Sequence, residues 1–161
     1  MTNKKLYDMN TIVETLKKYL KKENINLTLE GKTREEAYTE LLSLSIKNKE
    51  IPDKNFILDK IIERDELSDS YMGKGVVMVR IHLDTLKNIL LLIGIKKDGI
   101  YEDVFDREKI KIFIIIITPD SKQEEYINLV SKLSNLLNQG SIRDDILEAE
   151  TPENVIKTLL E

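Results

Sequence analysis

The sequence predicts an α/β domain in which a mixed β-sheet is flanked by helices on both faces. Two apolar runs, residues 90–93 and 112–117, are continuous instead of alternating, which is typical of central strands covered on both faces. Helical and extended patterns alternate along the 161 residues without a Pro- or Gly-rich linker or an internal repeat. We therefore expect residues 1–161 to form a single domain, with residues 1–23 as an N-terminal helix packed on or preceding the core.

The first two elements are predicted from the spacing of apolar residues. An apolar stripe at helical spacing predicts a helix over about residues 9–22. The stripe consists of Ile12, Leu16 and Tyr19 or Leu20. Apolar and polar residues then alternate over residues 24–30, which predicts a short strand.

Helix-start signals predict the next two helices. Thr33 and Glu36 have the spacing of a capping box, and the helix that follows should end near Asn48. Pro52-Asp53 should open another helix, because proline is well suited to a first helical turn. This helix brings Arg64 to its C-terminal end, where the helix dipole favours a cation.

The middle of the chain predicts the strands of the sheet. Runs of β-branched and aliphatic residues predict strands over residues 76–81, 89–95 and 111–117. A weaker pattern predicts a further strand around residues 100–105.

The C-terminal part predicts three more helical segments. Ser121 and Glu124 form a second capping box, and Gly140 can end the helix that follows in the left-handed conformation. The inward face of that helix is predicted to contain Ile127, Val130, Leu133 or Ser134, and Leu137. Ser141 starts a short segment, and Thr151-Pro152 begins the final helix.

A glycine turn precedes the strand that carries the candidate site residues. Gly73 and Gly75 bracket Lys74 and allow a tight turn before the extended segment. Because this turn leads into a strand and not a helix, it is not a phosphate-binding P-loop. Side chains two positions apart on a strand share a face, so Arg80 and His82 point to the same side.

Composition excludes several classes of function. The formal net charge is -4 and no cluster of Lys and Arg stands out, so nucleic acid is not an expected partner. The longest apolar run is far shorter than the roughly 20 residues that span a bilayer, so we expect a cytoplasmic protein without membrane insertion. With no cysteine and one histidine, thiolate and histidine-rich metal sites are excluded, and we expect no cofactor.

Several short motifs occur in an order that resembles one known family. They are Asn24-Ile25, Lys32-Thr33-Arg34-Glu35-Glu36-Ala37, Arg64-Asp65, Gly73-Lys74-Gly75 with residues 76–80, Thr118-Pro119, and the helix containing Tyr126. This order is similar to that of the fructose, mannitol and nitrogen-regulatory class (type 2) of enzyme IIA domains of the bacterial phosphoenolpyruvate-dependent sugar phosphotransferase system. The resemblance implies a mixed-sheet α/β fold. It also implies protein partners: a histidine-containing carrier protein, a transporter domain or a regulatory target.

The chain departs from this family at the positions that carry its chemistry. The resemblance places the family's phosphorylated histidine at Arg80, the neighbouring proline at Val79, and a second, supporting histidine at Tyr126. Of the family's chemical set, only the helix-end arginine is retained, as Arg64. A guanidinium stays protonated and offers no lone pair, so Arg80 cannot replace the histidine as phosphoryl acceptor.

The preferred interpretation is a degenerate enzyme IIA-like module that does not carry phosphate on the usual histidine. As a pseudo-phosphocarrier, it would regulate by protein contact. Its docking surface is expected around the site equivalent to the phosphohistidine, Arg80, with Gly73, Gly75 and Tyr126 as the surround.

Two alternatives remain open. The first is an active phosphoryl carrier that uses His82, about 7 Å further along the strand than Arg80. The second is a sensor of a small anion or phosphometabolite, in which Arg64 and Arg80 hold the oxyanion together. Each residue also has a purely structural explanation: His82 as a strand-end histidine, Arg64 as a helix-end cation, and Arg80 as an arginine whose stem packs while its head reaches solvent.

Overall fold

The computed structural model describes residues 2–47, 50–51 and 53–161, and its centre is a five-stranded mixed sheet. The strands are β1 (Ile25–Asn26), β2 (Tyr71–Gly73), β3 (Val76–His82), β4 (Leu90–Ile100) and β5 (Ile110–Thr118). Their order across the sheet is β1-β4-β5-β3-β2. β1 is parallel to β4 and β3 is parallel to β5, whereas β4–β5 and β2–β3 are antiparallel pairs.

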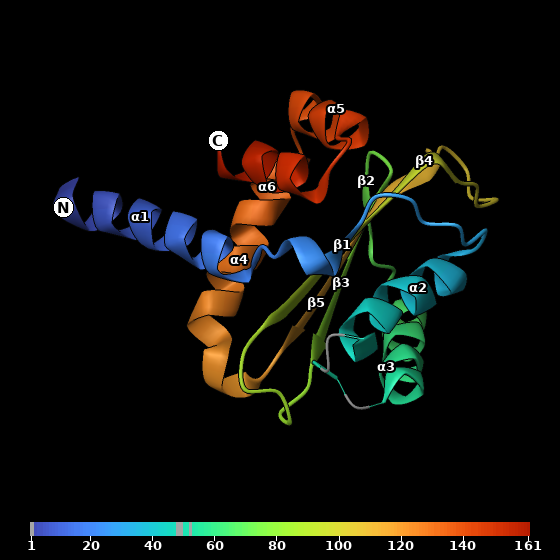
Figure 1. Cartoon of the computed structure of the whole chain (residues 1–161), viewed down its shortest axis with the longest axis horizontal. Helices are drawn as coiled ribbons and strands as arrows, with labels where there is room; N and C mark the ends of the chain where they lie inside the picture. Colours follow the sequence, from blue (N-terminus) through green and yellow to red (C-terminus); the bar gives the residue numbers. More distant parts are fainter. Residues whose placement is uncertain (1, 48–49, 52) are drawn as a thin grey trace.

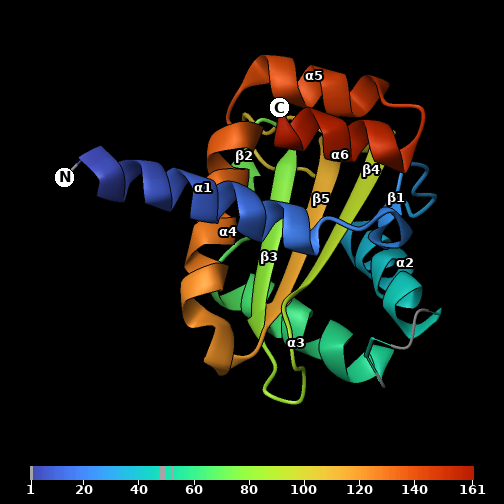
Figure 2. The same ribbon diagram turned by 60° about the vertical axis from the view of Figure 1, so that its left-hand side comes forward.

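Helices cover both faces of this sheet, as Figures 1 and 2 show. On one side lie α2 (Arg34–Lys47) and α3 (Lys54–Leu67). On the other lie α1 (Thr2–Tyr19), α4 (Gln123–Leu137), α5 (Gly140–Glu148) and α6 (Pro152–Leu160). The short helices η1 (Lys22–Asn24) and η2 (Asp120–Lys122) precede β1 and α4. The predicted fold class, a mixed sheet between two helical layers, is confirmed.

The alternation of side chains along each central strand builds a separate hydrophobic core on each face. In β5, Ile114 and Ile116 contribute to the core under α1 and α4, whereas Phe113 and Ile115 contribute to the core under α2 and α3. All four side chains are buried, which explains why the apolar run is continuous. β3 alternates in the same way, so Met78 and the residues that share its face, Arg80 and His82, lie on the α4 side.

The N-terminal helix begins and ends earlier than the helix predicted over about residues 9–22, and the strand after it is shorter than predicted. α1 starts at Thr2 and extends away from the body of the protein at its N-terminal end (Figure 1). Its last turn is anchored, because the Tyr19 hydroxyl donates to the carboxylate of Glu125 on α4. Only two residues of the predicted strand 24–30 pair with β4. The side chain of Asn26 then accepts a hydrogen bond from the backbone N–H of Thr28 (2.9 Å), which ends the regular pairing, and a single further bond joins the Leu29 N–H to the Ile95 carbonyl of β4 (3.0 Å).

Two of the predicted helix starts are confirmed by their hydrogen bonds. The Thr33 hydroxyl accepts from the backbone N–H of Glu36 (3.2 Å) at the start of α2. The Asp53 carboxylate accepts from the backbone N–H groups of Asn55 and Phe56 at the start of α3. The predicted α2 end near Asn48, and Pro52, lie outside the described residues.

The weak strand predicted at residues 100–105 is wrong. Ile100 is the last residue of β4 and pairs with Ile110, and residues 101–109 form the connection between β4 and β5. The sequence also missed β2, which forms a hairpin with β3. Both errors concern segments at the edge or end of the sheet, where few side chains are buried to set a periodic pattern.

Three predictions around α4 are also wrong. Ser121 lies in η2, and Lys122, at the cap of α4, makes no side-chain capping bond. The predicted inward residue Ile127 is 52% exposed, because the buried stripe of α4 runs through Leu129 and Leu133 instead. Gly140 begins α5 and does not end α4 in the left-handed conformation.

The predicted glycine turn is confirmed and leads directly into β3. Gly73, Lys74 and Gly75 all have positive φ, at +96°, +59° and +76°. The carbonyl oxygen of Gly75 accepts hydrogen bonds from the backbone N–H groups of Lys111 and Ile112, which fixes the turn against β5. A Cβ atom on Gly75 would lie 2.6 Å from the carbonyl oxygen of Lys109, whereas one on Gly73 would meet nothing within 4 Å.

Gly75→Ala should therefore destabilise the protein more than Gly73→Ala. In both variants the alanine must adopt a positive φ, which lowers the free energy of unfolding by roughly 1–2 kcal/mol. Gly75→Ala adds a backbone clash and should lower the free energy of unfolding by about 3 kcal/mol in total. Urea denaturation of the two variants and the wild type measures the difference. Equal losses would show that contact with β5 does not require a glycine at residue 75.

Candidate functional site

Arg64 and Arg80 line the same cavity, a pocket of about 230 Å³ beside the edge of the sheet. Arg64 comes from the last turn of α3, and Arg80 comes from the C-terminal part of β3. The wall between them is formed by the chain that leaves α3 and enters β2, and α4 closes the other side. The remaining lining residues are Ser68, Asp69, Ser70, Tyr71, Met72, Met78, Val130 and Ser134. The structure thus brings together the two arginines that the sequence singled out.

Neither arginine has an internal partner among the residues that the structure describes. Both side chains belong to exposed residues, and neither guanidinium makes an ion pair or hydrogen bond within the described ranges. Within those ranges Arg64 has no carboxylate partner, and it lies in the last turn of α3, as its structural explanation of a helix-end cation expects. Two unpaired guanidiniums in one cavity can bind an oxyanion in a bidentate manner.

The acidic residue in the cavity wall, Asp69, does not neutralise these two arginines because its oxygens are engaged elsewhere. One oxygen accepts from the Arg34 guanidinium (2.7 Å), and the other accepts from the Arg107 guanidinium (2.8 Å). The backbone N–H of Tyr71 also donates to Asp69 (2.9 Å). Burial would raise the pKa of Asp69, but these hydrogen bonds outweigh it and hold the pKa well below its usual value.

Arg34 and Arg107 also share a second carboxylate, Glu102, in the connection between β4 and β5. The Arg34 guanidinium donates two hydrogen bonds to Glu102 (3.0 and 2.6 Å), and Arg107 donates a third (2.8 Å). The Arg107 guanidinium also stacks over the Tyr71 ring, 4.2 Å from its centroid. We call Arg34, Asp69, Glu102 and Arg107 the wall network, since it ties α2 and the β4–β5 connection to the cavity wall. Sequence reasoning missed it, because Arg34 and Glu102 are 68 positions apart and leave no local pattern.

His82 lies beyond Arg80 on β3 and has a different environment. Its Nδ1 is 3.1 Å from the Asp120 carboxylate, and its ring contacts the Tyr126 ring edge-on, with the centroids 5.5 Å apart. The side chain is half exposed. When Asp120 accepts a hydrogen bond from Nδ1, the lone pair of the neutral ring resides on Nε2. Asp84 accepts a hydrogen bond from the backbone N–H of Asp120 (3.0 Å).

The predicted surround of Arg80 does not gather around the arginine cavity. Gly73 and Gly75 precede β3, whereas Arg80 lies near the opposite end of that strand. Tyr126 packs against His82 and the core under α4. None of these three residues lines the cavity of Arg64 and Arg80.

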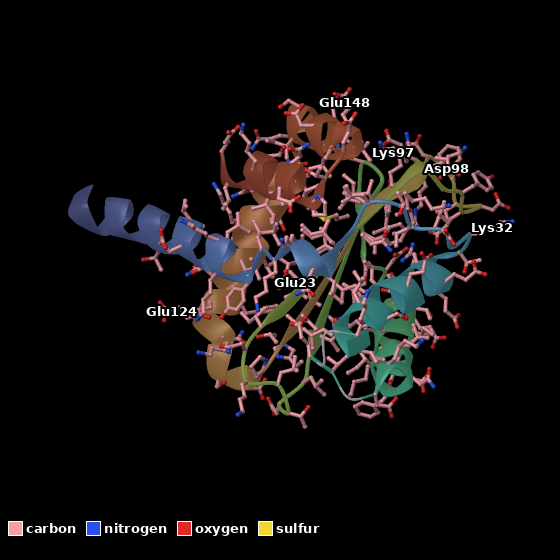
Figure 3. The ribbon with its side chains drawn as sticks, viewed as in Figure 1. Glu23, Lys32, Lys97, Asp98, Glu124 and Glu148 are labelled. Carbon is pink, nitrogen blue, oxygen red and sulfur yellow. The ribbon has the colours of Figure 1, made fainter. Side chains whose placement is uncertain are left out.

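The surface carries charges of both signs. In Figure 3, Lys97 lies beside Asp98 at the end of β4, and Glu124 and Glu148 lie on other elements. Within the described ranges, no group of three or more histidine or acidic side chains is arranged to hold a metal ion. None of the helices in that part of the chain has both the length and the apolar character needed to cross a bilayer.

Comparison of the sequence with known proteins identifies one family. Residues 18–161 match the family described as "Phosphoenolpyruvate-dependent sugar phosphotransferase system, EIIA 2". The fructose-specific EIIA component from Haloferax volcanii is 27% identical over 139 residues, which cover 86% of this chain and 90% of that protein. The fructose-specific EIIABC component from Bacillus subtilis is 25% identical over 137 residues. Those residues cover 85% of this chain but only 22% of that longer protein.

Comparison with solved structures shows the same fold. Nitrogen regulatory protein IIA-Ntr from Neisseria meningitidis matches with a TM-score of 0.79 and 19% identity over 88% of this chain and 97% of that one. The enzyme IIA mannitol component from Escherichia coli, solved in complex with phosphorylated enzyme IIB, matches with a TM-score of 0.70 and 18% identity. That match covers 87% of this chain and 96% of the other. At these identities the likeness concerns the fold.

Arg34→Met should destabilise the protein in a pH-dependent manner. It leaves Glu102 and Asp69 with fewer donors, and the free energy of unfolding at neutral pH should fall by about 2 kcal/mol. Hydrogen bonds from arginine lower the pKa of both carboxyls against the opposing effect of burial. The stabilisation they provide is therefore complete above about pH 5 and is lost as the pH falls through their folded-state values. Urea denaturation at neutral and acidic pH should show that the difference in the free energy of unfolding between variant and wild type narrows below about pH 5.

Arg64→Met is the matched control for this experiment, since Arg64 makes no ion pair within the described ranges. It should change the free energy of unfolding by less than about 0.5 kcal/mol at either pH. If the difference in the free energy of unfolding between Arg34→Met and wild type stayed constant with pH, the loss would come from packing of the arginine stem and not from its hydrogen bonds.

Proposed function

The chain belongs to the EIIA type 2 family of the phosphoenolpyruvate-dependent sugar phosphotransferase system, and we propose that it is a cytoplasmic regulatory module of that system. In this proposal, residues 1–161 act as one domain. The domain works by contact with protein partners and does not carry phosphate at the position that the family uses.

The observation that carries this proposal is the identity and environment of Arg80. It occupies the strand position where the resemblance places the phosphorylated histidine, and it is exposed near the end of β3. A protonated guanidinium has no lone pair with which to attack phosphorus. It remains able to bind the phosphoryl group of another molecule as a donor of hydrogen bonds. Arg80 therefore suits recognition and not covalent transfer.

The class of partner is inferred from related proteins. In the Escherichia coli complex, an enzyme IIA mannitol component is bound to a phosphorylated enzyme IIB. A domain of the same fold thus meets a phosphorylated protein. For this chain we propose a partner of that kind: a histidine-containing carrier protein, a transporter domain or a regulatory target.

A second candidate function is phosphoryl transfer through His82, and it is favoured by one contact. Asp120 can hold the Nδ1–H of His82 and leave Nε2 free to act as a nucleophile. Two observations oppose it. His82 lies two strand positions beyond Arg80, about 7 Å away, and transfer needs in-line positioning. In addition, the carboxylate of Asp120 lies beside the ring and would repel an incoming phosphoryl group.

Intact-mass spectrometry separates these two functions. Wild type and His82→Gln are incubated with phosphoenolpyruvate, enzyme I and the histidine-containing carrier protein. Our proposal predicts that neither protein gains the mass of an acid-labile phosphoryl group, because no imidazole occupies the transfer position.

An authentic enzyme IIA that becomes labelled in the same mixture is the positive control. Labelling of wild type but not of His82→Gln would overturn the proposal and establish a carrier with a relocated nucleophile.

A further inference from the structure

We propose that the cavity of Arg64 and Arg80 is a non-covalent binding site for a terminal phosphoryl group. The inference deepens the proposed function, on which it rests, by naming the chemical group that the regulatory surface recognises. The site would hold this group on its donor molecule and release it unchanged.

The first argument is the pairing of the arginines. The chain has five, and three of them have partners within the protein. Arg34 and Arg107 bind carboxylates of the wall network, and Arg143 donates to the backbone carbonyl of Leu137 (2.9 Å). Only Arg64 and Arg80 make no such bond within the described residues, and both line one cavity. Their positive charges are therefore available to a ligand from outside.

The second argument is the local charge balance. Asp69 is the acidic side chain among the lining residues, and two arginines of the wall network already hold its carboxylate. It remains ionised at neutral pH, but its charge is shared with Arg34 and Arg107 and not with the cavity arginines. A ligand with two negative charges would balance Arg64 and Arg80, which matches a phosphoryl group near neutral pH.

The third argument is the size and lining of the cavity. At about 230 Å³ it is smaller than the roughly 300–1,000 Å³ of pockets that enclose a drug-sized ligand. Ser68 and Ser134 add hydroxyl groups, while Met78 and Val130 add apolar surface. The space thus fits a compact tetrahedral group with the rest of its donor molecule outside.

The cavity also lacks an imidazole side chain that could accept the phosphoryl group. None of the lining side chains is an imidazole, and His82 is not among them. A serine needs an adjacent general base to become nucleophilic, and the Asp69 oxygens are occupied by arginine donors. The Ser70 hydroxyl does donate to the Asp65 carboxylate, but that carboxylate is also held by the Tyr38 hydroxyl and the Arg34 guanidinium. The site therefore combines phosphoryl recognition with no imidazole acceptor.

Binding of inorganic phosphate and of phosphoenolpyruvate, measured by calorimetry on the full chain, tests the site. Wild type should bind both, and Arg64→Met and Arg80→Met should each weaken binding by about tenfold or more. Arg80→Lys, which keeps the charge but not the two-pronged donor, should give a smaller loss. The matched control is Lys60→Met, which removes a cation one turn earlier on α3 and outside the cavity and should leave affinity unchanged.

A second arm distinguishes the two sources of a phosphoryl group. The histidine-containing carrier protein is added in its phosphorylated and unphosphorylated forms. Tighter binding of the phosphorylated form, lost in Arg80→Met, would identify the ligand as a phosphoryl group presented by a protein. Binding of the free ligands without this preference would identify a small phosphorylated metabolite. Either outcome supports the site.

The proposal is overturned if wild type does not bind the free ligands and also binds the phosphorylated carrier protein no more tightly than the unphosphorylated one. It is also overturned if Lys60→Met weakens binding as much as Arg64→Met, since the effect would then be general electrostatic attraction. These outcomes are separate from a failure of the proposed function, because labelling of His82 is detected by mass and does not depend on affinity at the cavity.

Discussion

The carboxylate of Asp69, held between Arg34 and Arg107, is the interaction on which the architecture of the site depends. It joins the start of α2, the segment between α3 and β2, and the connection between β4 and β5. These segments are far apart in sequence, and the residues of the β4–β5 connection, 101–109, are exposed or half-buried. The same interaction removes a carboxylate from competition for Arg64 and Arg80. One charged cluster thus both builds the cavity wall and leaves the cavity positive.

The two hydrophobic cores explain how the position of Arg80 on β3 is fixed. β3 lies between β5 and β2, and its apolar side chains are buried on both faces. A shift of one residue would place the whole set on the wrong face, so the register is strongly specified. Arg80 follows this buried stretch at the edge of the α4 layer. In our proposal, this strand position holds a guanidinium where the resemblance places the family's imidazole, and this replacement would change the available chemistry from transfer to recognition.

The fold could be predicted largely from local patterns, but the site could only partly be. Short-range spacing in the sequence predicts three of these features. They are the continuous burial of β4 and β5, the caps at Thr33 and Asp53, and the shared face of Arg80 and His82. The wall network and the His82–Asp120 contact join residues tens of positions apart, for which no periodic signal exists. Gly140 is predicted to end α4 in the left-handed conformation, but it is the first residue of α5. A glycine alone does not tell which helix it belongs to.

The most direct test of the central claim is a crystal structure of the protein grown with phosphoenolpyruvate. Our account predicts an intact ligand whose phosphoryl oxygens lie within about 2.7–2.9 Å of both the Arg64 and the Arg80 guanidinium, as in charge-assisted hydrogen bonds. It also predicts that Asp69 remains bound to Arg34 and Arg107. A ligand located elsewhere, or either cavity arginine turned onto a carboxylate of the protein, would contradict the account.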